Sequence, residues 1–149
     1  MDLVDSRLSF CKQELGVDFT INAASDAKTA LAEMTGGDFL TVVMDATGNA
    51  KSMGNTINFL SHGGKLVYIG LFIGDFQLND PEFHKREATL LSTRNATRSD
   101  FLQVIDLMHK GTVKAGPLIT HRADFTNLKD EFPKWIHPDS DMIKAIVDF

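Results

Sequence analysis

The sequence contains a single cysteine, Cys11, among its 149 residues. A lone thiol excludes an internal disulfide, and it excludes a structural zinc site built from several thiolates. The spacing of apolar residues around Cys11 predicts that this side chain belongs to the core. We therefore expect the protein to work in a reducing, cytoplasmic compartment.

Long apolar runs and an excess of positive charge are also missing. No stretch approaches the roughly 20 apolar residues that cross a bilayer, and the first residues lack the pattern of a secretion signal. The net charge is −5, with acidic and basic residues interspersed, so the chain offers no positive field to a phosphodiester backbone. We expect neither a membrane span nor a nucleic-acid partner.

Gly-x-Gly does not occur in the sequence, although the chain has 11 glycines. The turn that holds the pyrophosphate of a dinucleotide is built on that motif. The five histidines show no His-x-x-x-His or His-Glu-x-x-His spacing. His84 and Glu87 share a helical face, but their neighbours are typical of a solvated charged turn rather than of a metal site. We expect no metal ligand in this chain.

Two apolar runs, Phe39 to Met44 and Lys65 to Ile69, predict strands that are covered on both faces, as in a parallel sheet. Between them, Asn49 can cap a helix that continues to Leu60 and ends at the glycines that follow His62. This alternation is typical of right-handed βαβ units. The fold class that it predicts is α/β, with a doubly wound parallel sheet and helices on both faces.

Further helices and strands are predicted from the spacing of apolar residues and from the capping, glycine and proline residues that begin or end each segment. We expect a helix from Asp5 to Gly16 and a second helix that starts at Ser25 or Asp26 and turns Met34 inward. A helix capped by Ser99 is amphipathic, which predicts that it packs on the sheet. A helix before Pro133 should end at that residue. The expected further strands are Val17 to Ile21, Phe76 to Leu78, Thr89 to Thr93 and Met142 to Val147.

Ligands of open α/β sheets bind beyond the carboxyl ends of the strands, so the turns after the strands are the candidate site. Small residues in Asp45 to Gly48 and in Ile69 to Leu71 let the backbone approach a flat ligand. Asp2 precedes a helix, where a carboxylate can bind both hydroxyls of an adenosine ribose. The same charge would repel a 2′-phosphate, which favours NAD over NADP.

Several segments together are similar to the zinc-type medium-chain alcohol dehydrogenases, in particular to the polyol, sorbitol and threonine dehydrogenase branch. They cover nearly the whole chain, and their order makes coincidence improbable. The segments are Asp2-Leu3 with Arg7-Leu8, Leu15 to Asp18, Val43 to Gly48, Gly63 to Gly70, Lys85 to Leu90, Ser92 to Arg94 and Leu118 to His121.

The resemblance implies a role in NAD binding for ten residues. Asp2 would bind the adenosine ribose, and Arg7 would lie over the adenine side. The turn residues Ala46, Thr47 and Gly48 would line the adenosine and the adjacent ribose. The nicotinamide end would meet Ile69, Gly70 and Leu71, and backbone groups near Ser92 and Arg94 would hold the carboxamide.

The resemblance also implies what the chain lacks. Residues 1–149 would form an incomplete Rossmann domain without its first βα unit, followed by the C-terminal tail of the enzyme. The catalytic zinc ligands would lie in another domain, so this chain would hold no catalytic residue. The complete enzyme would transfer hydride from a secondary alcohol or polyol to NAD, and it would form a homo-oligomer through a strand from Phe76 to Asn79.

Two alternatives remain open on the sequence. An acid after a strand and the segment Leu60 to Val67 also occur in S-adenosylmethionine-dependent methyltransferases, which share the doubly wound class. The chain could also be a non-catalytic, dimerising remnant that keeps the fold elements but binds no nucleotide.

Overall fold

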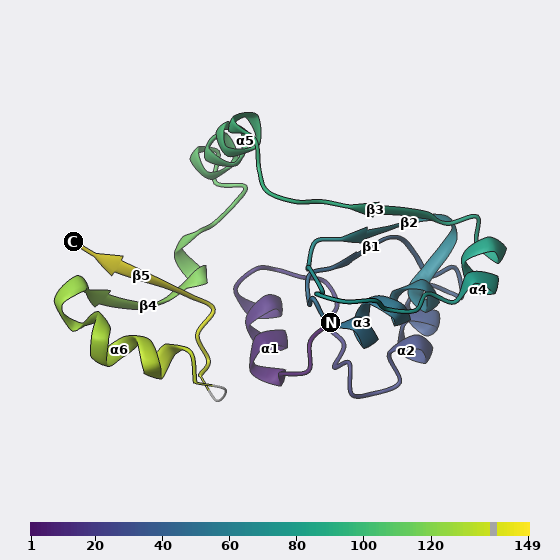
Figure 1. Ribbon diagram of the computed structural model, residues 1–149, viewed down its shortest axis with the longest axis horizontal. Helices are drawn as coiled ribbons and strands as arrows, with labels where there is room; N and C mark the ends of the chain where they lie inside the picture. The colour runs from purple at the N-terminus through teal and green to yellow at the C-terminus, as the bar shows by residue number, and fades with distance from the viewer. Residues whose placement is uncertain (138–139) are drawn as a thin grey trace. The chain divides into compact units, whose positions relative to one another are not determined.

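The computed structural model describes residues 1–137 and 140–149. They form two compact units, of which one is Ala24–Asn95 and the other joins Met1–Ala23 to Ala96–Phe149. Figure 1 shows the helices and strands of both units. Throughout these two ranges, every helix is too short or too polar to pass through a lipid bilayer.

The unit Ala24–Asn95 contains a parallel sheet in the order β1 (Leu40–Asp45), β2 (Leu60–Tyr68), β3 (Thr89–Ser92). The predicted helix from Asn49 is shorter than expected. It comprises α3 (Ala50–Asn55) and the 3₁₀ turn η1 (Thr56–Phe59), and Leu60 already pairs with Leu40 in the sheet. The predicted start of β2 at Lys65 was therefore too late, because pairing with β1 overrides the helical periodicity through Leu60.

The other helices of this unit begin at polar caps. The Asp26 carboxylate accepts a hydrogen bond from the Thr29 backbone N–H at the start of α2 (Ala27–Met34). Asn79 does the same for Glu82 at the start of α4 (Asp80–Lys85). The predicted strand from Phe76 to Leu78 is wrong, since the described structure has no ladder there.

The core of this unit lies on one face of the sheet. Val43 and Leu66 are buried there together with Ile57 of η1. Alternate residues of a strand point to opposite faces, and on the other face Val42 is 45% and Met44 65% exposed. The prediction that β1 is covered on both faces is thus wrong, because β1 is an edge strand and this face has no helix of the unit against it. Met34, predicted inward, is also exposed.

The other unit begins with an isolated parallel bridge between Asp2 and Asn22 and the helix α1 (Asp5–Gln13). The expected strand Val17 to Ile21 is not formed, because the Val17 N–H bonds to the Cys11 carbonyl at the end of α1. Cys11 itself is half-buried rather than in the core, and Leu8 is the buried residue of α1.

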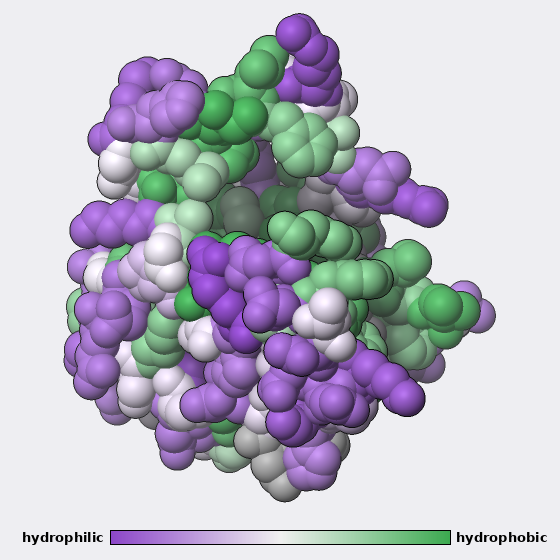
Figure 2. Space-filling view, turned by 90° about the vertical axis from the view of Figure 1, so that its left-hand side faces the viewer, coloured by the Kyte–Doolittle hydropathy of each residue, from purple (hydrophilic) through white to green (hydrophobic). Residues whose placement is uncertain are grey.

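The helix α5 (Arg98–His109) starts at Thr97 rather than at Ser99, because Thr97 and Asp100 form a reciprocal capping box. Its apolar residues are exposed apart from the half-buried Leu107, with Phe101 at 62%, so its packing on the sheet stays a prediction. Hydrophobic side chains reach the surface elsewhere too, and Figure 2 shows them between hydrophilic ones on one face. Phe125 and Phe149, both exposed, stack on each other at 5.2 Å.

A second parallel pair, β4 (Ile119–Asp124) with β5 (Lys144–Asp148), follows the short 3₁₀ turn η2 (Gly116–Leu118). Between these strands lie the turn η3 (Phe125–Asn127) and α6 (Leu128–Trp135), which contacts β4. The predicted break at Pro133 is wrong: the proline removes one donor, yet the Ile136 N–H still bonds to the Phe132 carbonyl. All the strand pairs named here are parallel, which confirms the α/β prediction.

Candidate functional site

The carboxyl ends of the three strands of the unit Ala24–Asn95 lie side by side. Asp45 of β1 pairs with Tyr68 of β2, and Tyr68 pairs with Ser92 of β3. The next residue, Thr93, still donates its backbone N–H to the Tyr68 carbonyl at 3.1 Å. The turns that follow β1 and β2 therefore leave the sheet at the same end, the carboxyl end of its strands, where β3 also ends at Ser92.

The turn after β1 is organised by Asp45, a residue that is only 5% exposed. Its Oδ1 accepts hydrogen bonds from the Thr47 backbone N–H (2.9 Å) and from the Thr47 hydroxyl (2.7 Å). Its Oδ2 accepts one from the Ser52 hydroxyl of α3 at 2.6 Å. The buried carboxylate is thus satisfied by three donors, and it connects the turn to α3.

The two turns are held against each other by backbone contacts. The Asp45 carbonyl accepts the N–H groups of Ile69 (2.8 Å) and Gly70 (3.0 Å). A Cβ placed on Gly48 would lie 2.7 Å from the Leu71 carbonyl oxygen, and Gly48 has φ +61°. Only glycine fits there, because a side chain would meet backbone that cannot move aside and would have to adopt a left-handed conformation.

Tyr68 lies behind the two turns and is buried. Its hydroxyl donates to the Met53 carbonyl at 2.8 Å and lies 3.3 Å from the Thr56 hydroxyl, and its ring meets Phe76 edge-on at 5.4 Å. Burial raises the pKa of Tyr68, and the negative charge of Asp45 adds to the rise, while the hydrogen bond with Thr56 opposes it. The phenol is therefore neutral and fixed.

The outer surface of the turns is apolar. Ile69 is 48% and Leu71 77% exposed, and the small residues Ala46 and Thr47 are exposed beside them. Exposed aliphatic side chains next to an accessible backbone suit a flat, partly apolar ligand better than a compact ion. The structure thus brings together six of the sequence-predicted residues, Ala46 to Gly48 and Ile69 to Leu71, with Ser92 at the same edge.

The remaining predicted residues are in other places. Arg94 is exposed after β3. Asp2 and Arg7 belong to the other unit, where the Asp2 carboxylate accepts the Val4 N–H at 3.0 Å and Arg7 is exposed on α1. That Asp2 and Arg7 share one nucleotide with Thr47 and Gly70 stays a prediction.

Sequence reasoning missed two residues of the site, Asp45 as an organiser and Ser52 as its partner. Ser52 follows the cap Asn49 by three residues, which is only a weak signal of its bond to Asp45.

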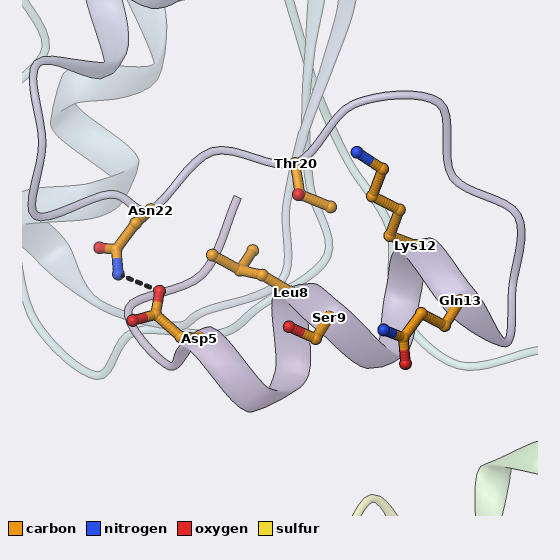
Figure 3. Close-up of a pocket in the computed structure, with 7 residues that line it drawn as sticks. All are labelled: Asp5, Leu8, Ser9, Lys12, Gln13, Thr20 and Asn22. Carbon is orange, nitrogen blue, oxygen red and sulfur yellow. Dashed lines mark hydrogen bonds between the residues drawn. The ribbon is translucent and has the colours of Figure 1, made fainter.

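Sequence reasoning also missed a pocket of about 390 Å³ between α1 and residues 20–22 (Figure 3). In this pocket the Asp5 carboxylate accepts a 2.7 Å hydrogen bond from the Asn22 amide. The other residues that line it are Leu8, Ser9, Lys12, Gln13 and Thr20.

A metal centre is not built by the residues that the structure describes. They contain no group of three or more histidine, cysteine, aspartate or glutamate side chains that could hold a metal ion. His84 lies 3.0 Å from Asp80 and His62 lies 3.5 Å from Glu87, but each is an exposed pair. Two ligands do not make a zinc site, so zinc does not fit here.

Comparison with known proteins gives consistent matches. The profile of the family described as zinc-binding dehydrogenases matches residues 1–110. The L-galactonate-5-dehydrogenase of Escherichia coli is 40% identical over 127 residues, which are 85% of this chain and 37% of that protein. An NAD-dependent alcohol dehydrogenase of Sulfurisphaera tokodaii is 29% identical over 121 residues, which are 80% of this chain and 34% of that protein. The chain spans about two fifths or less of the length of these relatives.

Solved structures share the fold. An Escherichia coli oxidoreductase of unknown specificity superposes with a TM-score of 0.90 at 21% identity, over 99% of this chain and 42% of its own. An Escherichia coli alcohol dehydrogenase solved with NADH gives 0.88 at 24% identity, over 99% and 43%. The relatives named here are dehydrogenases or oxidoreductases, and they do not support the methyltransferase interpretation or the non-catalytic remnant.

Proposed function

Since the chain belongs to the zinc-binding dehydrogenase family, we propose that it forms part of the NAD-binding domain of an alcohol or polyol dehydrogenase. One observation carries this proposal: the turns after two neighbouring parallel strands meet at one edge, with Gly48 packed against Leu71. Ligands of open parallel sheets bind at this place.

Each turn has its own part in the proposed site. Ala46, Thr47 and Gly48 line the adenosine and its ribose, and Ile69, Gly70 and Leu71 meet the nicotinamide end. The exposed side chains of Ile69 and Leu71 support this assignment, because a nicotinamide ring needs an apolar surface. The backbone near Ser92 and Arg94 holds the carboxamide, while Asp2 binds the adenosine ribose and Arg7 covers the adenine.

The chemistry of the complete enzyme needs more than this chain. NAD held by these residues would supply the hydride acceptor for the oxidation of a secondary alcohol or polyol. The residues of this chain bind and orient the cofactor. The glycine-rich turn and the zinc ligands belong to other parts of the enzyme, so residues 1–149 are a partial Rossmann domain with the C-terminal tail and are inactive when alone.

We also propose that the protein is cytoplasmic and forms a homo-oligomer through residues 76–79. This segment is anchored from behind, by the contact of Phe76 with Tyr68 and by a close approach of the Gln77 carbonyl to Gly54. Its backbone is free of a ladder within the described residues and can pair with a second copy. Light scattering should give a multiple of the chain mass; a stable monomer at micromolar concentration contradicts this proposal.

NADH titration followed by fluorescence tests the main proposal. We would compare the 149-residue chain with a hybrid that places the upstream part of the Escherichia coli L-galactonate-5-dehydrogenase before it. The hybrid should bind NADH, and Gly48→Val should abolish binding because the side chain strikes the Leu71 carbonyl. Gly63→Val is the matched control, since Gly63 has a similar φ of +67° but open space around it. No binding by the unaltered hybrid would overturn the proposal.

A further inference from the structure

The Thr47 hydroxyl lies in the turn that faces the proposed nucleotide site, yet its hydrogen is already used. A hydroxyl has one hydrogen to donate and two lone pairs. Thr47 donates this hydrogen to Asp45 Oδ1 at 2.7 Å and accepts the Asn49 backbone N–H at 3.1 Å. The acceptor is a buried carboxylate, which makes the first bond a strong one. Thr47 therefore has no hydrogen left for a ligand.

Asp45 forms hydrogen bonds with three segments: the turn 46–48, α3 and the turn 69–71. Its carboxylate binds the turn through Thr47 and the helix α3 through Ser52, and its carbonyl binds Ile69 and Gly70 of the second turn. Asp45 is 5% exposed, so a ligand in solution cannot reach these bonds easily. Its side chain therefore acts on the site through the backbone that it fixes.

We propose that Asp45 is a positioning residue for the dinucleotide: its carboxylate fixes the turn 46–48 on α3, beside the turn 69–71 that its backbone carbonyl binds. Thr47 completes this framework and meets the nucleotide with its methyl group and backbone rather than with a donated hydroxyl hydrogen. This inference rests on the proposed function and adds a residue that determines the shape of that site.

Four variants separate this role from direct binding. Asp45→Ala removes the three bonds of the carboxylate, and Thr47→Val removes the two bonds of the hydroxyl but keeps the backbone N–H donor. Asp45→Asn and Thr47→Ser are conservative. The side-chain amide introduced by Asp45→Asn can accept both Thr47 bonds through its oxygen and donate to Ser52 through its nitrogen. Amide hydrogen exchange of Thr47 in the 149-residue chain reports the turn, and NADH titration of the hybrid protein reports the cofactor.

Asp45→Ala should speed the exchange of the Thr47 amide about tenfold or more and weaken NADH binding by a similar factor, since bonds to a charged group are lost. In the hybrid the KM for NAD should rise by that factor while kcat at saturating NAD is retained. Asp45→Asn should stay within about threefold of the unaltered protein in both measurements, and Thr47→Ser, which keeps the hydroxyl, should keep the exchange of the residue 47 amide within that range.

The opposite results are equally clear. If the Thr47 hydroxyl donates to the nucleotide, Asp45→Ala releases it and NADH affinity is kept or increased, which overturns the role of Asp45. A fall in kcat with an unchanged KM would overturn it as well. Thr47→Val gives a second test should Asp45→Ala fail to fold. Failure of the unaltered hybrid to bind NADH overturns the proposed function instead, and the amide exchange of the chain distinguishes the two cases.

Discussion

Gly70 lies so close to Gly48 that a Cβ on Gly70 would come within 2.3 Å of the Gly48 backbone nitrogen. Two turns that are about 20 residues apart in the sequence are thus in backbone contact, which requires glycine on both sides. The contact explains why a glycine occurs in the turn after β1 and in the turn after β2, and even a methyl group at either position should disturb the site.

A methyl group at Gly48 should destabilise the fold more than the same group at Gly63. Both glycines have a left-handed φ, but only Gly48 meets backbone, 2.7 Å from the Leu71 carbonyl oxygen. We expect Gly63→Ala to lower the free energy of unfolding by about 1 kcal/mol through strain, and Gly48→Ala by about 1 to 3 kcal/mol more through the clash. Urea unfolding measures both, and equal losses would mean that the turns are not packed as described.

The two opposite faces of the sheet should differ in how much stability is lost when a large side chain is replaced by alanine. Leu66 is fully buried, so Leu66→Ala should cost about 2 to 5 kcal/mol. Met44 on the neighbouring strand is 65% exposed, and Met44→Ala should cost less than about 0.5 kcal/mol in the 149-residue chain. In the hybrid protein, where an upstream strand can pair with β1, the cost at Met44 should rise. Chemical denaturation of both proteins tests this, and the same small cost in each would exclude coverage of this face.

Tyr68 should make the stability of the protein fall at high pH. Its folded pKa is raised above the ordinary value of 10.0, first by burial. The burial of the neutral phenol is therefore compatible with the fold at all pH values below 10. As the pH rises from 10 through the folded pKa, the free energy of unfolding falls, because the hydroxyl of the unfolded chain ionises first. Tyr68 is the one tyrosine in the sequence, so tyrosinate absorbance reports it directly.

The matched variant is Tyr68→Phe, which removes the hydroxyl and leaves the Met53 carbonyl without this donor. It should lower the free energy of unfolding at pH 7 by about 1 to 2 kcal/mol and flatten the decline above pH 10. A tyrosinate midpoint that is the same in the folded and the urea-unfolded protein would contradict the burial of the phenol.

Asp2 should set the preference for NADH over NADPH in the hybrid protein. Asp2→Ser removes the charge that repels a 2′-phosphate and the acceptor for the ribose hydroxyls. We expect NADH binding to weaken about tenfold and the ratio of NADPH to NADH affinity to rise. Asp18→Ser, at an exposed aspartate of the same unit, should leave the ratio unchanged. An unchanged ratio in Asp2→Ser would remove Asp2 from the site.

Much of the local structure was predictable because its causes are local. Asn49 and Asp26 cap helices through bonds to residues two or three positions away, so their side chains determine the starts of α3 and α2. The apolar run of β1 and the turn that follows it could be recognised in the same way. The order of the motifs also indicated the family, since a colinear set of short segments is more specific than any one of them.

Tertiary contacts determined what the sequence left open. Leu60 has the spacing of a helical residue, but it pairs with Leu40 and starts β2. Met44 looks like a core residue, yet its exposure depends on which elements cover the edge strand. Asp45 could not be distinguished from any acid at a strand end until its bonds to Thr47 and Ser52 were known. Periodicity and capping are properties of neighbouring residues, whereas burial and shared hydrogen bonds depend on segments that meet only when the chain is folded.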